Sequence, residues 1–371
     1  LPHTSAGPAS CTEAEVCAVC GAVIHPALGH SVGEDGVCVN CGQQIVPAGQ
    51  RYIAPGKGSA VSSDDADSVV AETAGEGHYH NTIAARYANA VLLCGDYGVE
   101  YFDPDPTGSS AYADTVNRFA AKYPSIHVSC LLTPKCCAYH SPADYTDPHD
   151  DIAQFIQSTY DKMDSTVTTV DCMGLMDRHA GEYLFYRTDH HWTSLGAYYA
   201  SAAYCQANGM TPWELDSYDT VIRTGYIGSL HMYGGRPAEL TANPDYSVAR
   251  FPHVGYSMVY YRDGVRYNGQ AVNGGTSEYA GMFLCGDQPL TVITTDHHND
   301  KTLLVFKESY GNAFIPYMID YYQRIVVVDI REEVGSVADI ISQYGVTDAL
   351  FINNCQAATS LLSNLDSRAR S

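Results

Sequence analysis

Short, almost uninterrupted hydrophobic runs recur in the last quarter of the chain. They cover residues 302–306, 324–329 and 349–352, and a segment with helical spacing, 333–344, separates the last two. Runs of this length, apolar on both faces, are typical of parallel strands that helices cover on both sides. The pattern therefore predicts an α/β fold with a mostly parallel sheet.

The same alternation of apolar runs and helical spacing begins near residue 79. Short apolar runs predict further strands at 91–94, 126–132 and 167–170. Apolar residues at i, i+3 and i+4 predict helices over 112–123, 150–163, 196–208 and 313–322.

Two segments break this alternation. Residues 215–290 are rich in Tyr, Gly and turn residues, with short strand-like pieces, and predict a β-rich insertion or long loops. Residues 46–78 are rich in Gly, Ala, Ser, Asp and Pro, which is typical of a linker. We therefore expect a small unit over 1–45, a linker over 46–78, and an α/β domain over 79–371 that contains the insertion at about 215–290.

Cysteines define the small N-terminal unit. Cys17 and Cys20, and then Cys38 and Cys41, form two Cys-x-x-Cys pairs that are each followed by glycine. This pattern predicts a zinc-knuckle-like unit with four thiolates around a structural Zn²⁺, and two disulfides are the alternative. A unit this small has little core, so metal or disulfides must hold it. The eight cysteines from Cys94 onward lie in apolar contexts and predict small buried hydrophobic residues, with one or two disulfides as an alternative.

Charge and composition argue against some classes of function. The net charge is −22 and is spread along the chain, which argues against binding nucleic acid or anionic lipid, since phosphates need Lys and Arg. The chain has 29 Tyr against 9 Phe, a choice that suits sugars and wet clefts, although half-exposed packing explains it equally well.

No run of apolar residues reaches the roughly 18–20 that are needed to span a bilayer. The chain starts at Leu1 rather than Met, so we expect that an upstream segment has been removed.

Candidate catalytic residues come from two distant stretches. Asp189 stands two residues before His191, and a carboxylate that near can fix the tautomer and orientation of an imidazole. Ser309 follows the predicted strand 302–306 and precedes a predicted helix, at the strand end where α/β folds place ligands. The backbone N–H groups at Ser309 and Tyr310, with the Asn312 side chain, are candidate donors to an oxyanion.

Each of these residues also has another interpretation. A serine before a helix is commonly a cap, and the nucleophile hypothesis depends on its combination with Asp189 and His191. His190 is expected to be structural, although metal-dependent hydrolysis by Asp189, His190 and His191 is an alternative. Arg331 follows the strand 324–329 and either reaches the site or forms a surface salt bridge.

These stretches resemble a known family. Residues 186–198, which contain Asp189-His190-His191-Trp192, resemble the signature of the DHHW proteins. Residues 307–314 resemble that family's second block, which is usually written Asp-Ser where this chain has Glu308-Ser309. Segments 228–230, 328–331 and 350–354 also fit, so the resemblance covers roughly residues 80–355. The family is similar to the SGNH-hydrolase-like domains of the alginate O-acetylation proteins.

The resemblance implies a fold, a site and an activity. It implies a three-layer α/β sandwich of the SGNH-hydrolase type, with Ser309 as nucleophile, His191 as base and Asp189 as the residue that orients His191. It implies carbohydrate O-acetyl transfer or ester hydrolysis through an acyl-enzyme, without a catalytic cofactor, at the surface of a bacterium or outside it. A polysaccharide and neighbouring membrane or cell-wall proteins are the implied partners. A catalytically weak carbohydrate-binding surface protein is the alternative, which Glu308 and the Tyr-rich segment 215–290 favour.

Overall fold

A computed structural model describes residues 85–103, 106–141 and 148–371, together with Ser5 and the short segments 15–19, 23–25 and 52–53. Cys20, Cys38 and Cys41 lie outside the described residues, and so does most of the predicted linker. In the N-terminal unit, β1 (Glu15–Val16) and β2 (Val23–His25) pair antiparallel. Within the predicted linker, β3 (Tyr52–Ile53) pairs with a strand of the insertion.

The largest sheet among the described residues has eight strands in the order β12-β11-β13-β15-β14-β16-β7-β8. Its parallel part consists of β15 (Arg324–Asp329), β14 (Thr302–Lys307), β16 (Asp348–Asn354), β7 (His127–Thr133) and β8 (Val167–Thr169). Three antiparallel strands extend one edge, namely β13 (Leu290–Thr295), β11 (Tyr256–Arg262) and β12 (Val265–Gly269). The predicted α/β class with a mostly parallel sheet is therefore confirmed. Every residue of β14 is buried, as its unbroken apolar run predicts.

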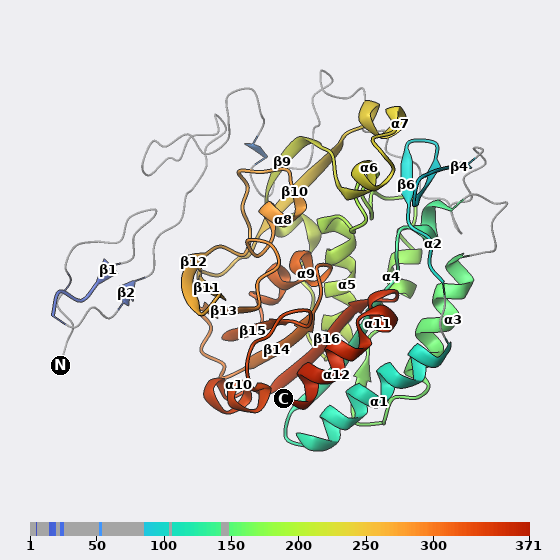
Figure 1. Ribbon diagram of the computed structural model, residues 1–371. Helices are drawn as coiled ribbons and strands as arrows, with labels where there is room; N and C mark the ends of the chain where they lie inside the picture. Colours follow the sequence, from blue (N-terminus) through green and yellow to red (C-terminus); the bar gives the residue numbers. More distant parts are fainter. Residues whose placement is uncertain are drawn as a thin grey trace.

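Helices lie on both sides of this sheet (Figure 1). Helix α9 (Gly311–Met318) connects β14 to β15, and α10 (Val337–Tyr344) connects β15 back past β14 to β16. These two connections run in opposite directions along the sheet, so right-handed crossovers place α9 and α10 on opposite faces. Helix α5 (Ser194–Ala207) packs on α9.

Among the described helices, four others pack together with α10 on its face of the sheet. Helices α10 and α1 both contact α12, and α1 also contacts α3 and α11. Their bounds are α1 (Pro106–Lys122), α3 (Pro148–Tyr160), α11 (Ala357–Ser360) and α12 (Leu362–Arg370). Helix α10 starts later than the predicted residue 333, because Ser336 caps it by accepting the Asp339 N–H, and Gly345 ends it with a positive φ of 62°.

The insertion contributes both to a separate sheet and to the main one. Strands β9 (Asp219–Tyr226) and β10 (Asp245–Phe251) pair with each other beside β3, whereas β11 and β12 join the edge of the large sheet. Short helical turns complete the segment, namely η1 (Leu215–Ser217), α6 (Ser229–Tyr233), α7 (Ala238–Ala242) and α8 (Tyr279–Met282). The segment 215–290 is thus β-rich, and it brings α6 and α8 toward the loop that precedes α5 (Figure 1).

The predicted strand at 91–94 forms, but outside the main sheet. It is β5 (Val91–Cys94), which pairs antiparallel with β4 (Ala85–Ala88) and β6 (Tyr97–Val99). Val91 and Leu93 bury their side chains against Leu230 and Leu240 of the insertion. The apolar run therefore reflects burial under α6 and α7 rather than a place in the parallel sheet.

Most of the later cysteines behave as small hydrophobic side chains. Buried free thiols occur at Cys130, Cys136, Cys137, Cys172, Cys205 and Cys355.

Two short helices, α2 (Cys137–His140) and α4 (Met173–Asp177), follow β7 and β8. None of the described helices combines the length and the apolar character that crossing a membrane requires.

Candidate active site

Ser309 lies in a tight turn at the carboxyl end of β14. The strand ends at Lys307 and α9 begins at Gly311, so only three residues separate the two elements. A Cβ atom at Gly311 would lie 2.6 Å from the Lys307 Cβ, and glycine is therefore required for the helix to start so close to the strand. The turn places Ser309 at the edge of the sheet where the parallel strands end, as the sequence predicts.

The loop before α5 carries Asp189 and His191 to the same place. Thr193 caps α5 by accepting the N–H groups of Leu195 and Gly196. Trp192 is buried, and its indole N–H donates to the Tyr310 carbonyl oxygen over 3.0 Å. This bond joins the loop directly to the Ser309 turn, so Trp192 has a structural role in the site.

The structure brings Asp189, His191 and Ser309 into one chain of hydrogen bonds. Asp189 Oδ1 lies 2.6 Å from His191 Nδ1, and His191 Nε2 lies 2.7 Å from Ser309 Oγ. An ionised carboxylate only accepts, so Nδ1 carries the ring proton and Nε2 is free to accept the proton of the serine hydroxyl. The three residues are 3%, 7% and 9% exposed, which leaves Ser309 the most accessible of them. This arrangement can activate Ser309 as a nucleophile.

The second oxygen of Asp189 is held by the insertion. Asp189 Oδ2 accepts the Tyr226 hydroxyl at 2.8 Å and the Ser229 N–H at 2.9 Å. Burial raises the pKa of Asp189, but the neighbouring His191 and the hydrogen bonds from His191 and the Ser229 N–H outweigh it and hold that pKa well below its usual range. A Cβ atom at Gly228 would lie 2.3 Å from the Asp189 Cβ, so glycine is what lets the two segments approach. The aspartate is therefore ionised and fixed from both sides.

Glu308, which stands where the family usually has Asp, spans two strand ends. Its Oε1 accepts the Asn354 N–H at 3.0 Å, and its Oε2 accepts the Tyr310 N–H at 3.1 Å. The Ser309 hydroxyl is a further 3.3 Å contact of Oε2. The buried glutamate thus ties the Ser309 turn to the end of β16.

The predicted oxyanion and substrate residues lie beside the turn with their donors engaged. Tyr310 is fully buried, its N–H donates to Glu308, and its hydroxyl donates to the His190 carbonyl oxygen. Asn312 donates its amide to Asp287 at 2.8 Å. Arg331 pairs with Asp287 at 2.9 Å and with Asp329 at 2.6 Å.

Asp287 joins these residues into one ion-pair network. Lys307 completes the network through bonds to Asp287 at 3.2 Å and Asp329 at 2.8 Å. Burial raises the pKa of Asp287, but the charges of Lys307 and Arg331 outweigh it and lower that pKa. Sequence reasoning missed Asp287, because it follows no strand or helix pattern and no motif surrounds it.

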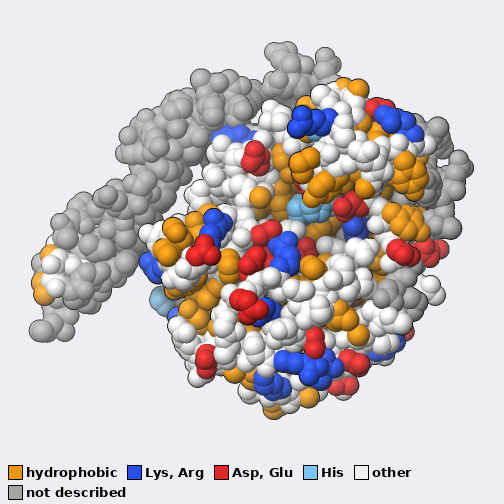
Figure 2. Space-filling view, viewed as in Figure 1, with side chains coloured by type: hydrophobic (Ala, Val, Ile, Leu, Met, Phe, Trp, Pro, Cys, Tyr) orange, Lys and Arg blue, Asp and Glu red, His pale blue; other side chains and the backbone are white. Residues whose placement is uncertain are grey.

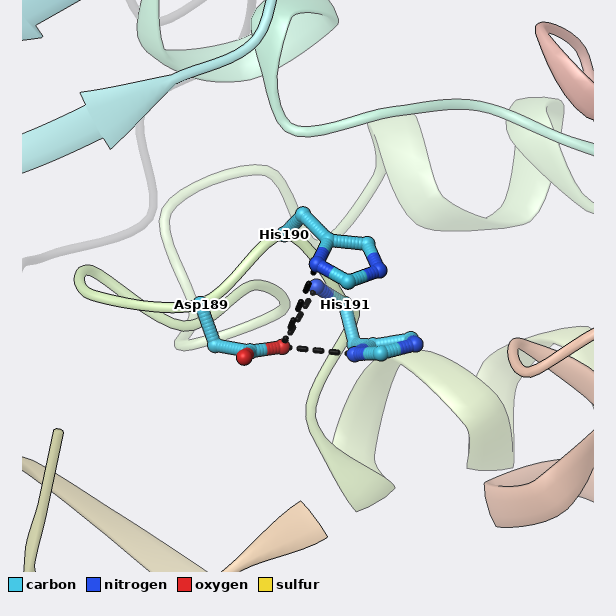
Figure 3. Close-up of side chains that lie close together, drawn as sticks. All are labelled: Asp189, His190 and His191. Atoms are coloured by element: carbon cyan, nitrogen blue, oxygen red, sulfur yellow. Dashed lines mark hydrogen bonds and ion pairs between the residues drawn. The ribbon is translucent and has the colours of Figure 1, made fainter. Parts of the chain in front are cut away.

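His190 packs against His191. The two ring centroids are 3.8 Å apart, and Figure 3 shows the imidazoles side by side next to Asp189. His190 Nδ1 lies 2.5 Å from Ser229 Oγ. Burial, followed by the neighbouring His191, lowers the pKa of His190 to about 4, so its ring is neutral near pH 7.

The same three side chains meet the geometric requirement for a metal site. One ligand atom each from Asp189, His190 and His191 can be chosen so that all lie within 4.8 Å of one another. However, the 2.6 Å separation of Asp189 Oδ1 and His191 Nδ1 is that of a charge-assisted hydrogen bond, and His191 Nε2 is engaged by Ser309. These contacts suit proton transfer, and the same atoms would have to give them up to bind a metal.

A surface hollow of about 590 Å³ opens beside Asp189. The insertion forms much of its wall, including the exposed side chains of Ile227 and Met232 and the charged side chains of Arg236 and Glu278. Figure 2 shows this face hollowed near its centre, where histidine surface lies between hydrophobic and charged side chains. The hollow offers both apolar and polar contacts to a ligand next to the hydrogen-bond chain.

The residues of this site lie in a segment that matches a known protein family. Residues 146–328, which include Asp189, His191 and Ser309, match the family model described as DHHW protein. The chain carries a DHHW family domain. A crystal structure of a DHHW family protein from Eubacterium siraeum is 28% identical, with a TM-score of 0.71, over 77% of this chain and 98% of that one. The DHHW fold therefore extends beyond the matched residues.

Two further solved structures are similar at lower identity. Bacillus cereus PatB1, solved with a sulfonyl adduct, is 14% identical with a TM-score of 0.60, over 73% of this chain and 98% of that one, and it shares the fold. The O-acetyltransferase domain of Pseudomonas putida AlgJ is 15% identical over 77% of this chain and 98% of that one, but its TM-score of 0.41 does not establish a common fold. Among curated proteins, none matches this chain.

Proposed function

We propose that this DHHW domain transfers an acyl group from an ester through a covalent Ser309 intermediate. The observation that carries the proposal is the hydrogen-bond chain from Asp189 through His191 to Ser309, with its two links of 2.6 and 2.7 Å. We further propose that the fold is a three-layer sandwich of the SGNH-hydrolase type. In such folds the ends of the parallel strands present the nucleophile.

The proposed reaction has two halves. His191 Nε2 takes the Ser309 proton as Oγ attacks the acyl carbon, and the imidazolium that forms is stabilised by Asp189. His191 then returns the proton to the leaving oxygen, and an acyl-serine remains. In the second half, His191 takes a proton from water or from a sugar hydroxyl, whose oxygen attacks the acyl-serine and releases Ser309.

We propose an acetylated carbohydrate as substrate and a bacterial extracellular or cell-surface location. The hollow beside Asp189 supports a carbohydrate, because it combines apolar side chains with charged ones at its wall. The strongly negative chain supports a neutral or weakly charged polymer. The sulfonyl adduct of PatB1 supports a reactive group on this fold, since sulfonyl reagents attach to activated nucleophiles.

The rate of p-nitrophenyl acetate hydrolysis tests the proposal. We expect Ser309→Ala to remove nearly all turnover, whereas Ser257→Ala, at an exposed serine of β11, leaves it unchanged. Adding an unacetylated oligosaccharide and examining it by mass spectrometry separates transfer from hydrolysis. Equal rates for the wild type and Ser309→Ala would refute the acyl-enzyme.

A second candidate is a carbohydrate-binding protein with little catalysis. Glu308 Oε2, 3.3 Å from Ser309 Oγ, favours it, because this carboxylate competes with His191 for the serine proton. Glu308→Gln distinguishes the two functions. In a protein inactive because of this competition, the substitution raises the rate, whereas in an active enzyme it does not.

We also propose that the N-terminal pairs Cys17, Cys20, Cys38 and Cys41 hold one structural Zn²⁺. The Val19 N–H donates to Cys17 Sγ over 3.4 Å, a contact that suits a thiolate in a tight knuckle. Elemental analysis of the full chain should give about one zinc per chain, and Cys17→Ser should lose it. Disulfides among these cysteines, found by mass spectrometry, would contradict the proposal.

A further inference from the structure

We propose that His190 is a second catalytic histidine, whose Nε2–H donates a hydrogen bond to the acyl oxygen as Ser309 attacks. This inference deepens the proposed acyl transfer and rests on it. The oxyanion that forms on the acyl oxygen needs donors placed in advance, and such donors contribute much of the catalysis in acyl transfer.

Most of the donors at the start of α9 are already engaged. The N–H groups of Tyr310, Gly311 and Asn312 donate to the Glu308 carboxylate, the Glu308 carbonyl and the Ser309 carbonyl. The side-chain amide of Asn312 donates to Asp287. The three backbone N–H groups cannot receive developing charge without breaking a bond of the turn. The Ser309 N–H and the second hydrogen of the Asn312 amide are the donors left at this end of α9, so a donor from another segment adds to a small set.

The direction of the His190 ring also favours this role. Figure 3 shows the outer nitrogens of His190 and His191 pointing the same way, away from Asp189. His191 Nε2 faces Ser309 Oγ at 2.7 Å, so the outer nitrogen of His190 points toward the nucleophile's side of the site. The His190 side chain is 25% exposed against 9% for His191, which makes it the more accessible of the two rings.

The contact at His190 Nδ1 favours the tautomer that this role requires. His190 Nδ1 lies 2.5 Å from the hydroxyl oxygen of Ser229. Among the described residues Ser229 Oγ has no other hydrogen-bonding partner, so its proton is available to Nδ1. A neutral ring that accepts at Nδ1 carries its proton on Nε2, and burial keeps this ring neutral near pH 7. His190 therefore offers one N–H donor, and Nε2 has no other partner in the described part of the chain.

In the proposed addition step His190 donates a hydrogen bond but transfers no proton. The Ser309 Oγ–carbon bond forms, the Oγ proton passes to His191 Nε2, and the carbonyl electron pair moves onto the acyl oxygen. That oxygen accepts the bond from His190 Nε2–H, and the pair returns when the leaving group departs. A neutral imidazole can act in this way as an electrophile, so the two neighbouring histidines have different roles, one as base and one as donor.

Kinetics of p-nitrophenyl acetate hydrolysis by the full chain test the inference. We expect His190→Phe, which keeps a ring on His191, to lower kcat about 100- to 1,000-fold with KM changed less than about threefold. His190→Gln restores an N–H donor and should recover part of the loss. Ser229→Ala keeps the backbone bond to Asp189 but frees His190 Nδ1, and should lower kcat about tenfold. Thermal melting checks that each variant folds.

Nitrogen-15 NMR of the histidine rings gives a readout that a packing role would not move. We expect the Nε2–H tautomer for His190 in the wild type and a shift toward Nδ1–H in Ser229→Ala. A wild-type Nδ1–H tautomer would overturn the inference, as would a folded His190→Phe with more than about a third of the wild-type kcat. In both cases the proposed function stands if turnover still depends on Ser309. Without such turnover the proposed function fails and this inference fails with it.

Discussion

Asp189 connects the base to the insertion, and its two oxygens have separate tasks. Oδ1 faces His191, whereas Oδ2 is held by Tyr226 and Ser229. The sequence made Asp189 and His191 predictable as a pair, because only His190 separates them. It gave no sign of Tyr226, since a tyrosine near the end of a strand in a Tyr-rich segment has no distinguishing pattern.

Asp189→Asn tests the task of Oδ1. The asparagine side chain keeps the shape, but its NH₂ group can face Nδ1 and favour the ring tautomer that cannot accept the Ser309 proton. We expect kcat for p-nitrophenyl acetate to fall roughly 1,000- to 10,000-fold while the protein stays folded. Tyr226→Phe is the matched control, because it removes one bond to Oδ2 only, and it should cost less than about tenfold. Similar losses in both variants would mean that Asp189 acts mainly as a structural anchor.

At the scale of the elements, the site depends on how three strand ends are joined. Glu308 follows β14 and accepts the N–H of Asn354 at the end of β16, and Asp329 at the end of β15 pairs with Lys307 of β14. These buried contacts hold the Ser309 turn against its neighbours. The contact with Asn354 explains how Glu308 can stand where the family usually has Asp, since the longer side chain reaches across to β16.

Glu308→Gln and Glu308→Asp test this connection. The Gln amide turns one NH₂ group toward a backbone N–H donor, and the Asp side chain is one methylene too short to span both partners. We expect each variant to lower the free energy of unfolding by about 1–3 kcal/mol, because a buried N–H loses its acceptor. Urea denaturation followed by circular dichroism measures this. Unchanged stability in both variants would show that Glu308 does not tie the two strands.

The strands that the sequence predicts are those buried on both faces. Strands β14, β15 and β16 lie in the middle of the sheet, so their apolar runs are continuous and easily recognised. Strands β11 and β12 at the edge alternate or are mostly exposed, and their pairing with the main sheet could not be predicted from residues 215–290. The Asp287 network was equally invisible, because its members are brought together only by the fold.

At the scale of the whole molecule, buried histidines make stability depend on pH. Burial, with a smaller effect of Arg187, lowers the pKa of His140 to about 3, and burial lowers the pKa of His190 to about 4. In the unfolded chain both titrate near about 6.5. The unfolded state therefore binds more protons than the native state between these values, so stability is full above about pH 7 and is lost as the pH falls.

We expect each of these two histidines to cost about 2 kcal/mol of unfolding free energy between pH 7 and pH 5. Urea denaturation at the two pH values measures the loss. His140→Phe keeps a ring against Tyr97, with which His140 stacks at 3.9 Å, but removes the titration, so its loss should be smaller by about 2 kcal/mol. His298→Gln, at an exposed position, is the matched control and should leave the loss unchanged. If His140→Phe shows the wild-type loss, then His140 is not the buried neutral group that its surroundings imply, and other groups cause the pH dependence.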